Sequence, residues 1–170
     1  MRARKRPGDR LAEHDPAFGE GPCPGYGVVG RWQIDHQGVP VRFEHNPEYL
    51  PSPRALGMPE PENAAEAALQ SFVAKHLEKE ALRRVLLDAP LAVRTDSEEP
   101  GLYLEANRFG AGEVSACTSL RLVPAGWQEH RVMTGRQIAE KVPGAVLALN
   151  PGHEPTAAIG LSEIRRLALD

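Results

Sequence analysis

The sequence predicts an α/β (α+β) fold, a two-layer mixed sheet with packed helices. Short apolar runs bounded by Gly, Pro or Asn recur along the chain, as in buried strands. Residues 62–87 contain no Gly or Pro and are rich in helix-forming residues. The final segment, Lys141–Asp170, has the pattern strand, tight turn, strand, helix. Such elements pair helices with a sheet around one apolar core.

The first 24 residues are expected to form a flexible, basic, Pro/Gly-rich N-terminal tail. Residues 1–10 carry five basic side chains and little apolar surface. Such termini are commonly solvated, although a basic arm for an anionic partner is the alternative. Residues 11–26 show no hydrophobic period and predict an irregular segment that ends near Tyr26.

A hairpin and a Pro-rich connection are predicted next, over residues 25–61. Apolar residues alternate in Gly27–Asp35 and again in Val39–His45, with a short Gly-containing turn between them. Pro40 favours an edge position for the second strand. Residues 46–61 hold five prolines, which exclude a regular helix or a central strand.

The stretch 62–87 is predicted to be one long helix, or two helices joined near residues 77–79. Its apolar residues recur every three or four positions and should face the sheet. The first part of this stripe comprises Ala65, Leu69, Phe72, Val73 and Leu77.

Residues 88–170 are predicted to form the C-terminal α/β half. Asp96–Gly101 is expected to be an acidic turn. Thr134 and Gln137 have the spacing of a capping box, which indicates a short helix before Pro143. Ser162 is expected to cap the last helix. Strands are predicted at residues 90–95, 102–107, 113–118, 130–133, 146–149 and 157–160.

Composition excludes several classes of protein. The formal net charge of −3 gives no overall field that attracts nucleic acid. The longest apolar runs are too short to span a membrane, and the first residues do not have the pattern of a signal peptide. The two cysteines form no Cys-x-x-Cys motif. We therefore expect a cytoplasmic protein without membrane insertion or bound nucleic acid.

No catalytic, cofactor-binding or metal-binding residues are predicted. The sequence contains no nucleophile elbow, phosphate-binding loop or dinucleotide-binding fingerprint. His36 and His45 flank the hairpin close to Glu44, but their spacing matches no recognised metal-ligand pattern. Cys117 lies in a predicted strand, where a buried cysteine is more usual than a nucleophile. The residues thus favour a protein that is not an enzyme.

The candidate interaction surface consists of Arg31, Trp32 and Tyr49. Arginine, tryptophan and tyrosine are enriched in the hot spots of protein interfaces, and all three lie in the hairpin or just after it. The alternative for the two aromatic residues is that they anchor the core.

Two motifs in the C-terminal half resemble the SseB-like domain. In that family a strand ends in a Phe-Thr-Ser-like signature, and a later strand closes in Asn-Pro-Gly. Here Ala116-Cys117-Thr118-Ser119 stands at the first position, with Cys117 in place of Phe, and Leu149-Asn150-Pro151-Gly152 matches the second.

The front half is similar to actinobacterial proteins described as type VII secretion system-associated. The shared motifs are Val28-Val29-Gly30-Arg31-Trp32, Asn46-Pro47-Glu48-Tyr49 and the run from Pro51 to Pro61. Together the two resemblances cover roughly residues 25–170. They imply a single SseB-like α/β domain over these residues and a genomic link to secretion, and the family has no established catalytic residues to carry over.

Three functions remain open at this point. The first is a non-enzymatic interaction or accessory protein of a type VII secretion locus, with a protein partner. The second is an immunity-like or chaperone-like partner that masks one secreted protein. The third is a small-ligand-binding protein or hydrolase with an unrecognised site, which would need a pocket with converging polar groups.

Overall fold

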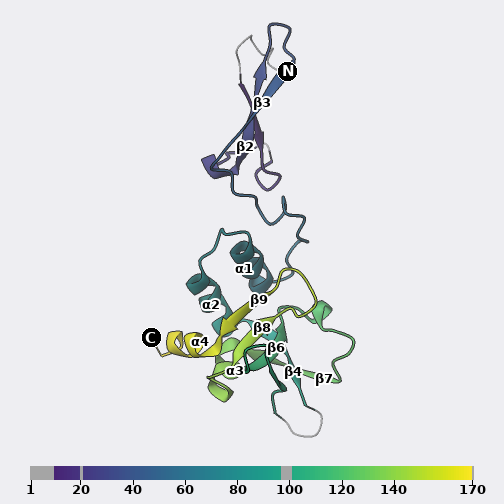
Figure 1. The fold of residues 1–170 in the computed structure, drawn as a ribbon, viewed down its shortest axis with the longest axis vertical. Helices are drawn as coiled ribbons and strands as arrows, with labels where there is room; N and C mark the ends of the chain where they lie inside the picture. The colour runs from purple at the N-terminus through teal and green to yellow at the C-terminus, as the bar shows by residue number, and fades with distance from the viewer. Residues whose placement is uncertain (1–9, 20, 97–100, 170) are drawn as a thin grey trace. The chain divides into compact units, whose positions relative to one another are not determined.

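The computed structural model describes residues 10–19, 21–96 and 101–169, drawn in colour in Figure 1. They contain four α-helices and two sheets, which confirms the predicted α+β class. The chain divides into two compact units, Met1–Pro59 (unit 1) and Glu60–Asp170 (unit 2), where a single domain over residues 25–170 was predicted. Residues 1–9 of the expected basic tail and 97–100 of the acidic turn lie outside the described residues.

Unit 1 is built on a three-stranded antiparallel sheet with the order β1-β2-β3. Its strands are β1 (Arg10–His14), β2 (Val28–Ile34) and β3 (Pro40–His45), and a 3₁₀ turn, η1 (Gly25–Gly27), precedes β2. The β2–β3 hairpin was predicted and is confirmed. Asp35 shapes its turn, because its carboxylate accepts hydrogen bonds from the backbone N–H groups of Gln37 and Val39.

Strand β1 was not predicted, since residues 11–26 were expected to be irregular. Leu11 pairs with Trp32 and Glu13 with Gly30, so the segment is an edge strand of the sheet. A short strand with largely polar residues has no apolar period, and its main-chain pairing with β2 leaves no signal in the sequence.

A buried carboxylate fixes the Pro-rich connection to the start of unit 1. Asp15 accepts hydrogen bonds from the backbone N–H groups of Ala17 and Ser52, the Ser52 hydroxyl and the Tyr49 hydroxyl. Burial raises the pKa of Asp15, but the hydrogen bonds from Ser52, Ala17 and Tyr49 outweigh it and lower the pKa overall. Leu56, which lies in the same connection, is exposed.

Unit 2 contains a six-stranded mixed sheet with the order β7-β4-β6-β8-β9, and β5 pairs with β6 beside this path. The β6–β8 pair is parallel and the other pairs are antiparallel. The strands are β4 (Pro90–Thr95), β5 (Leu104–Ala106), β6 (Gly112–Cys117), β7 (Glu129–Thr134), β8 (Val146–Leu149) and β9 (Ala157–Gly160).

Four helices pack with this sheet around one apolar core (Figure 1). They are α1 (Ala64–Val73), α2 (Lys79–Asp88), α3 (Gly135–Lys141) and α4 (Leu161–Leu167), and a 3₁₀ turn, η2 (Leu120–Leu122), follows β6. The largest fully buried side chains come from both layers: Leu69, Leu82, Leu86, Leu91, Ile138, Leu147, Leu149, Ile159, Leu161, Ile164, Val93 and Val114.

The stretch predicted as one helix or two is two helices. The chain turns between α1 and α2, where Lys75 has a φ of 64°, a value that an uninterrupted helix cannot contain. Leu69 is fully buried and Phe72 packs against the core, as predicted, but Val73 is exposed. The predicted stripe required helix as far as Leu77, and α1 ends at Val73.

Two helix N-caps were predicted in the C-terminal half; the first is confirmed and the second is wrong. Thr134 and Gln137 form the predicted capping box at the start of α3. Helix α4 begins two residues earlier than expected, with Gly160 rather than Ser162 as its N-cap and no side-chain cap. Leu161 is fully buried, so packing of this residue fixes where the helix begins.

Candidate functional site

The sheet of unit 1 presents two chemically different faces. Because side chains alternate along a strand, paired residues share a face and neighbours in sequence do not. One face, here called the aromatic face, carries Leu11, Glu13, Trp32, Phe43 and His45. The opposite, polar face carries Arg10, Ala12, Arg31, Gln33, Arg42 and Glu44.

The aromatic face is held by ring contacts around Phe43. Its ring centroid lies 4.8 Å from that of Trp32 and 4.8 Å from that of His45. A Cβ on Gly30 would lie 2.4 Å from the Phe43 ring. The ring can therefore pack directly over β2 only because residue 30 has no side chain. Trp32 donates its indole N–H to the Glu13 carboxylate at 3.0 Å. The face is thus rigid yet only half-buried.

The polar face carries a shallow groove of about 270 Å³. Among its lining residues are Arg10, Arg31 and Glu44 from the three strands. The Glu44 carboxylate accepts a hydrogen bond of 2.6 Å from the Gln33 amide and lies 3.5 Å from the Arg10 guanidinium.

The structure does not bring the three predicted interaction residues together on one surface. Arg31 lies on the polar face and Trp32 on the aromatic face. Tyr49 is half-buried, and its hydroxyl donates to Asp15 at 2.8 Å. Burial, together with this hydrogen bond and the charge of Asp15, raises the pKa of Tyr49 to about 12. Tyr49 therefore braces the connection, while Trp32 and Arg31 belong to different candidate surfaces.

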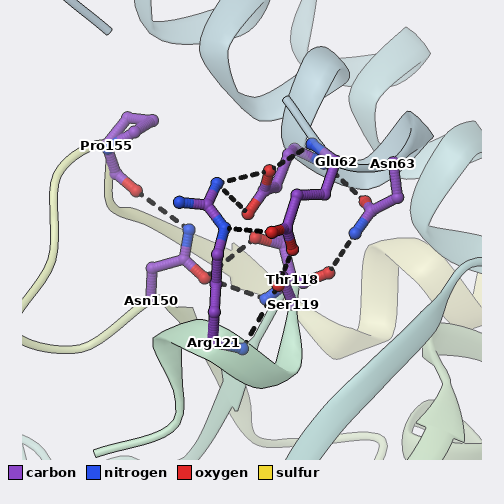
Figure 2. Close-up of polar contacts among 8 residues, drawn as sticks. Glu62, Asn63, Thr118, Ser119, Arg121, Asn150 and Pro155 are labelled. Atoms are coloured by element: carbon purple, nitrogen blue, oxygen red, sulfur yellow. Dashed lines mark hydrogen bonds and ion pairs between the residues drawn. The ribbon is translucent and has the colours of Figure 1, made fainter. Parts of the chain in front are cut away.

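A polar cluster in unit 2, shown in Figure 2, was not predicted from the sequence. It joins the residue after β8 to the loop after β6 and the start of α1. Asn150 is 2% exposed, and its side-chain oxygen accepts from the Thr118 backbone N–H at 2.9 Å and from the Thr118 hydroxyl at 3.1 Å. The Asn150 amide donates to the Pro155 carbonyl at 3.2 Å.

This contact joins the two sequence motifs that end strands β6 and β8. Thr118 belongs to the first motif and Asn150 to the second, and they follow the two parallel strands β6 and β8. The carboxyl ends of parallel strands lie at the same sheet edge, which is where ligands bind in many open α/β sheets. The Asn-Pro-Gly turn was predicted, but its long-range partner was not, because residue spacing does not reveal that pairing.

An ion-pair network extends the cluster to α1. Arg121 lies 3.0 Å from Glu62 (Figure 2). It also lies 2.9 Å from both carboxylate oxygens of Glu66, which is 3% exposed. The hydrogen bond to Glu66 and the nearby charges of Glu66 and Glu62 raise the pKa of Arg121. Ser119 donates to Glu62 at 2.5 Å, and Asn63 caps α1 while its amide donates to the Thr118 carbonyl. The polar side chains of this cluster thus serve as hydrogen-bond and ion-pair partners for one another.

A groove of about 440 Å³ runs beside this cluster. Its apolar part comes from Pro90, Ala92, Leu120 and Val132, of which the last two are well exposed. Its polar end includes Glu62 and Arg121. The arrangement can hold a small or elongated apolar group next to the Glu62–Arg121 ion pair.

Cys117 and two histidines are placed as follows. Cys117 is fully buried; burial raises its pKa to about 11, and its thiol donates to the Leu122 carbonyl at 3.2 Å. His36 and His153 are exposed. In the described part of the chain, no three His, Cys, Asp or Glu side chains gather in a way that could hold a metal ion.

No helix within the described ranges is both long and apolar enough to cross a bilayer. Comparison of the chain with protein-family models, with curated proteins and with solved structures gives no match.

Proposed function

We propose that the chain is a non-enzymatic protein-interaction or accessory protein associated with a type VII secretion locus. The motifs in residues 28–61 support the link to secretion, since they resemble proteins described in that way. Its site of interaction is the aromatic face of unit 1.

One observation carries the choice of this surface. Among the described residues of unit 1, Ile34 is the only buried hydrophobic side chain. A sheet of this size ordinarily buries one face to be stable. Here Trp32 and Phe43 remain half-buried and Leu11 is 37% exposed, and the described residues of unit 1 contain no α-helix that could cover them. An aromatic, ordered and incompletely covered surface is typical of an interface core.

The test compares variants on the two faces of the same sheet. Tagged wild-type chain is purified from an actinobacterium with a type VII system, and captured proteins are quantified by mass spectrometry. Trp32→Ala should reduce capture of a specific partner by about ten-fold or more, the effect of losing a hot-spot residue. Arg31→Ala, the matched control on the polar face, should reduce it by less than about two-fold.

A second variant protects this test against loss of folding. Leu11→Glu adds a charge to the aromatic face at an exposed position and empties no packed site. It should weaken capture like Trp32→Ala while circular dichroism remains that of the wild type. Loss of capture in Arg31→Ala alone would move the site to the polar groove, and equal capture by all variants would reject unit 1 as the interface.

The same purification separates the accessory role from an immunity-like or chaperone-like one. A masking partner binds one secreted protein in a tight one-to-one complex, whereas an accessory protein binds components that stay in the cell. The mass of the purified complex and the identity of its members decide between them.

Binding of a small ligand is the second candidate function, and the groove beside Arg121 supports it. Its apolar walls and single charge pair have the composition of small-molecule sites. Thermal-shift screening of wild type against Leu120→Glu would detect such a ligand, since only the wild type should be stabilised.

A further inference from the structure

Strand β3 is an edge of the unit 1 sheet, and it is poorly protected. In the described part of the chain, β3 pairs with β2 on one side and makes no main-chain hydrogen bond on the other. Natural edges usually carry prolines, bulges or lysines that prevent further pairing. In β3 the proline and the register shift are both at its start, at Pro40 and Val41, and Arg42–His45 are regularly paired.

The direction of the free main-chain groups follows from the hairpin. The backbone N–H of Asn46 donates to the Val29 carbonyl at 3.0 Å, so these two residues form a hydrogen-bonded pair. Hydrogen-bonded and non-hydrogen-bonded pairs alternate in an antiparallel ladder. Trp32–Phe43 is therefore a non-hydrogen-bonded pair, and the N–H and C=O of Phe43 point away from β2.

The order of charges in β3 selects one partner and one register. Suppose that the β3 strands of two copies pair antiparallel about a two-fold axis at Phe43. Arg42 of each copy then lies opposite Glu44 of the other. The adjacent two-fold registers, centred on Arg42 or on Glu44, would place like charges opposite each other, which destabilises a strand pair.

Main-chain geometry supports the same register. Phe43 would face its own copy as a hydrogen-bonded pair, with the outward N–H and C=O groups of both chains used. Arg42 and Glu44 would then form the non-hydrogen-bonded pairs, in which side chains approach most closely. Arg42 is exposed and has no ion pair among the described residues, whereas Glu44 has a long one at 3.5 Å to Arg10 and a hydrogen bond from Gln33.

We propose that two copies of this chain associate through β3, antiparallel and centred on Phe43, to form a continuous six-stranded sheet. The interface is isologous, as in most dimers. It joins the aromatic faces of the two copies on the same side of the sheet, and it does not depend on the proposed function. Because one strand pair buries less than the roughly 800 Å² per partner of a stable interface, the dimer is weak and forms as concentration rises.

The experiment is sedimentation equilibrium of the full chain over a wide concentration range. Wild type should show a monomer–dimer equilibrium. Arg42→Glu should weaken it about ten-fold or more, because two symmetric pairs become repulsive at once. Arg54→Glu, an equal charge change at an exposed position outside the strands, should leave the equilibrium unchanged.

A mixing experiment then tests the charge pairing across β3. Glu44→Arg should be monomeric on its own, but a mixture with Arg42→Glu should dimerise, since every pair across β3 then joins opposite charges. A wild type that stays monomeric, a dimer equally affected by Arg42→Glu and Arg54→Glu, or folded single variants that do not associate on mixing would each overturn the proposal. None of these outcomes bears on whether Trp32→Ala reduces capture of a partner, so the dimer and the partner-binding surface can be rejected independently.

Discussion

Replacement of Asn150 by Ala should destabilise unit 2 by about 2–4 kcal/mol. The change leaves the buried Thr118 backbone N–H without its acceptor, which costs about 1–3 kcal/mol. It also places Ala at a φ of 53°, in the left-handed region that Asn tolerates better, at a cost of roughly 1 kcal/mol. The two costs add because one concerns a hydrogen bond and the other the backbone.

Asn150→Gly separates these two costs. Glycine accepts the positive φ but supplies no acceptor, so its loss should be smaller than that of alanine. His153→Ala, an exposed change in the same turn, is the matched control and should shift stability by less than about 0.5 kcal/mol.

The assay is urea unfolding followed by tryptophan fluorescence. The chain has two tryptophans, so Trp127 reports on unit 2 when Trp32 is replaced by Phe. Stability changes are taken from the midpoint at an unchanged m-value. A loss below about 0.5 kcal/mol for Asn150→Ala would refute the bracing role of Asn150, and equal losses for Ala and Gly would refute the backbone contribution.

Four further outcomes are expected. Cys117 should resist a thiol reagent at pH 8 until the chain unfolds, because burial removes both access and thiolate; fast reaction in the native state would contradict this. Tyr49→Phe should cost about 1–3 kcal/mol in unit 1, from loss of a hydrogen bond to a carboxylate, measured by Trp32 fluorescence in a chain with Trp127 replaced by Phe. In the chain with Trp127 replaced by Phe and Tyr49 retained, unit 1 should lose stability as pH falls below about 4, because folding lowers the Asp15 pKa from its ordinary value of 3.8. The stability that the ionised Asp15 contributes is complete above pH 3.8 and is lost as pH falls through the lower pKa of the folded state. Gly135→Ala should cost about 1–3 kcal/mol, since its Cβ would meet a backbone carbonyl of α2, whereas Gly144→Ala, which meets open space, should not.

Much of the fold could be predicted because local signals agree with the final structure. The apolar run at Val146–Leu149 and the Asn-Pro-Gly turn lead to β8, the turn and β9 as expected. The capping box at Thr134 also formed as predicted. In both cases the determining interactions lie within a few residues of one another.

The candidate site was less accessible to sequence reasoning because its interactions are long-range. Nothing near Asn150 in the sequence indicates that Thr118 is its hydrogen-bond partner. Likewise, Asp15 accepts a hydrogen bond from Ser52, which is 37 residues away in the sequence. Glu66 was assigned only to a helix, although its carboxylate is buried against Arg121. These pairings depend on how strands and loops meet, which no local period records.

One feature of the interaction surface could have been recognised in advance. Arg31 and Trp32 are neighbours in a predicted strand, and neighbours in a strand face opposite sides. The sequence therefore already indicates that these two residues cannot form one surface, and the structure assigns Trp32 to the aromatic face and Arg31 to the polar face.

The most direct measurement of the proposed interface is hydrogen–deuterium exchange of the chain alone and in complex with its captured partner. Binding at the aromatic face should slow exchange of backbone amides in residues 28–45, with little change in residues 60–169. Slowed exchange confined to residues 60–169, with residues 28–45 unchanged, would contradict the account.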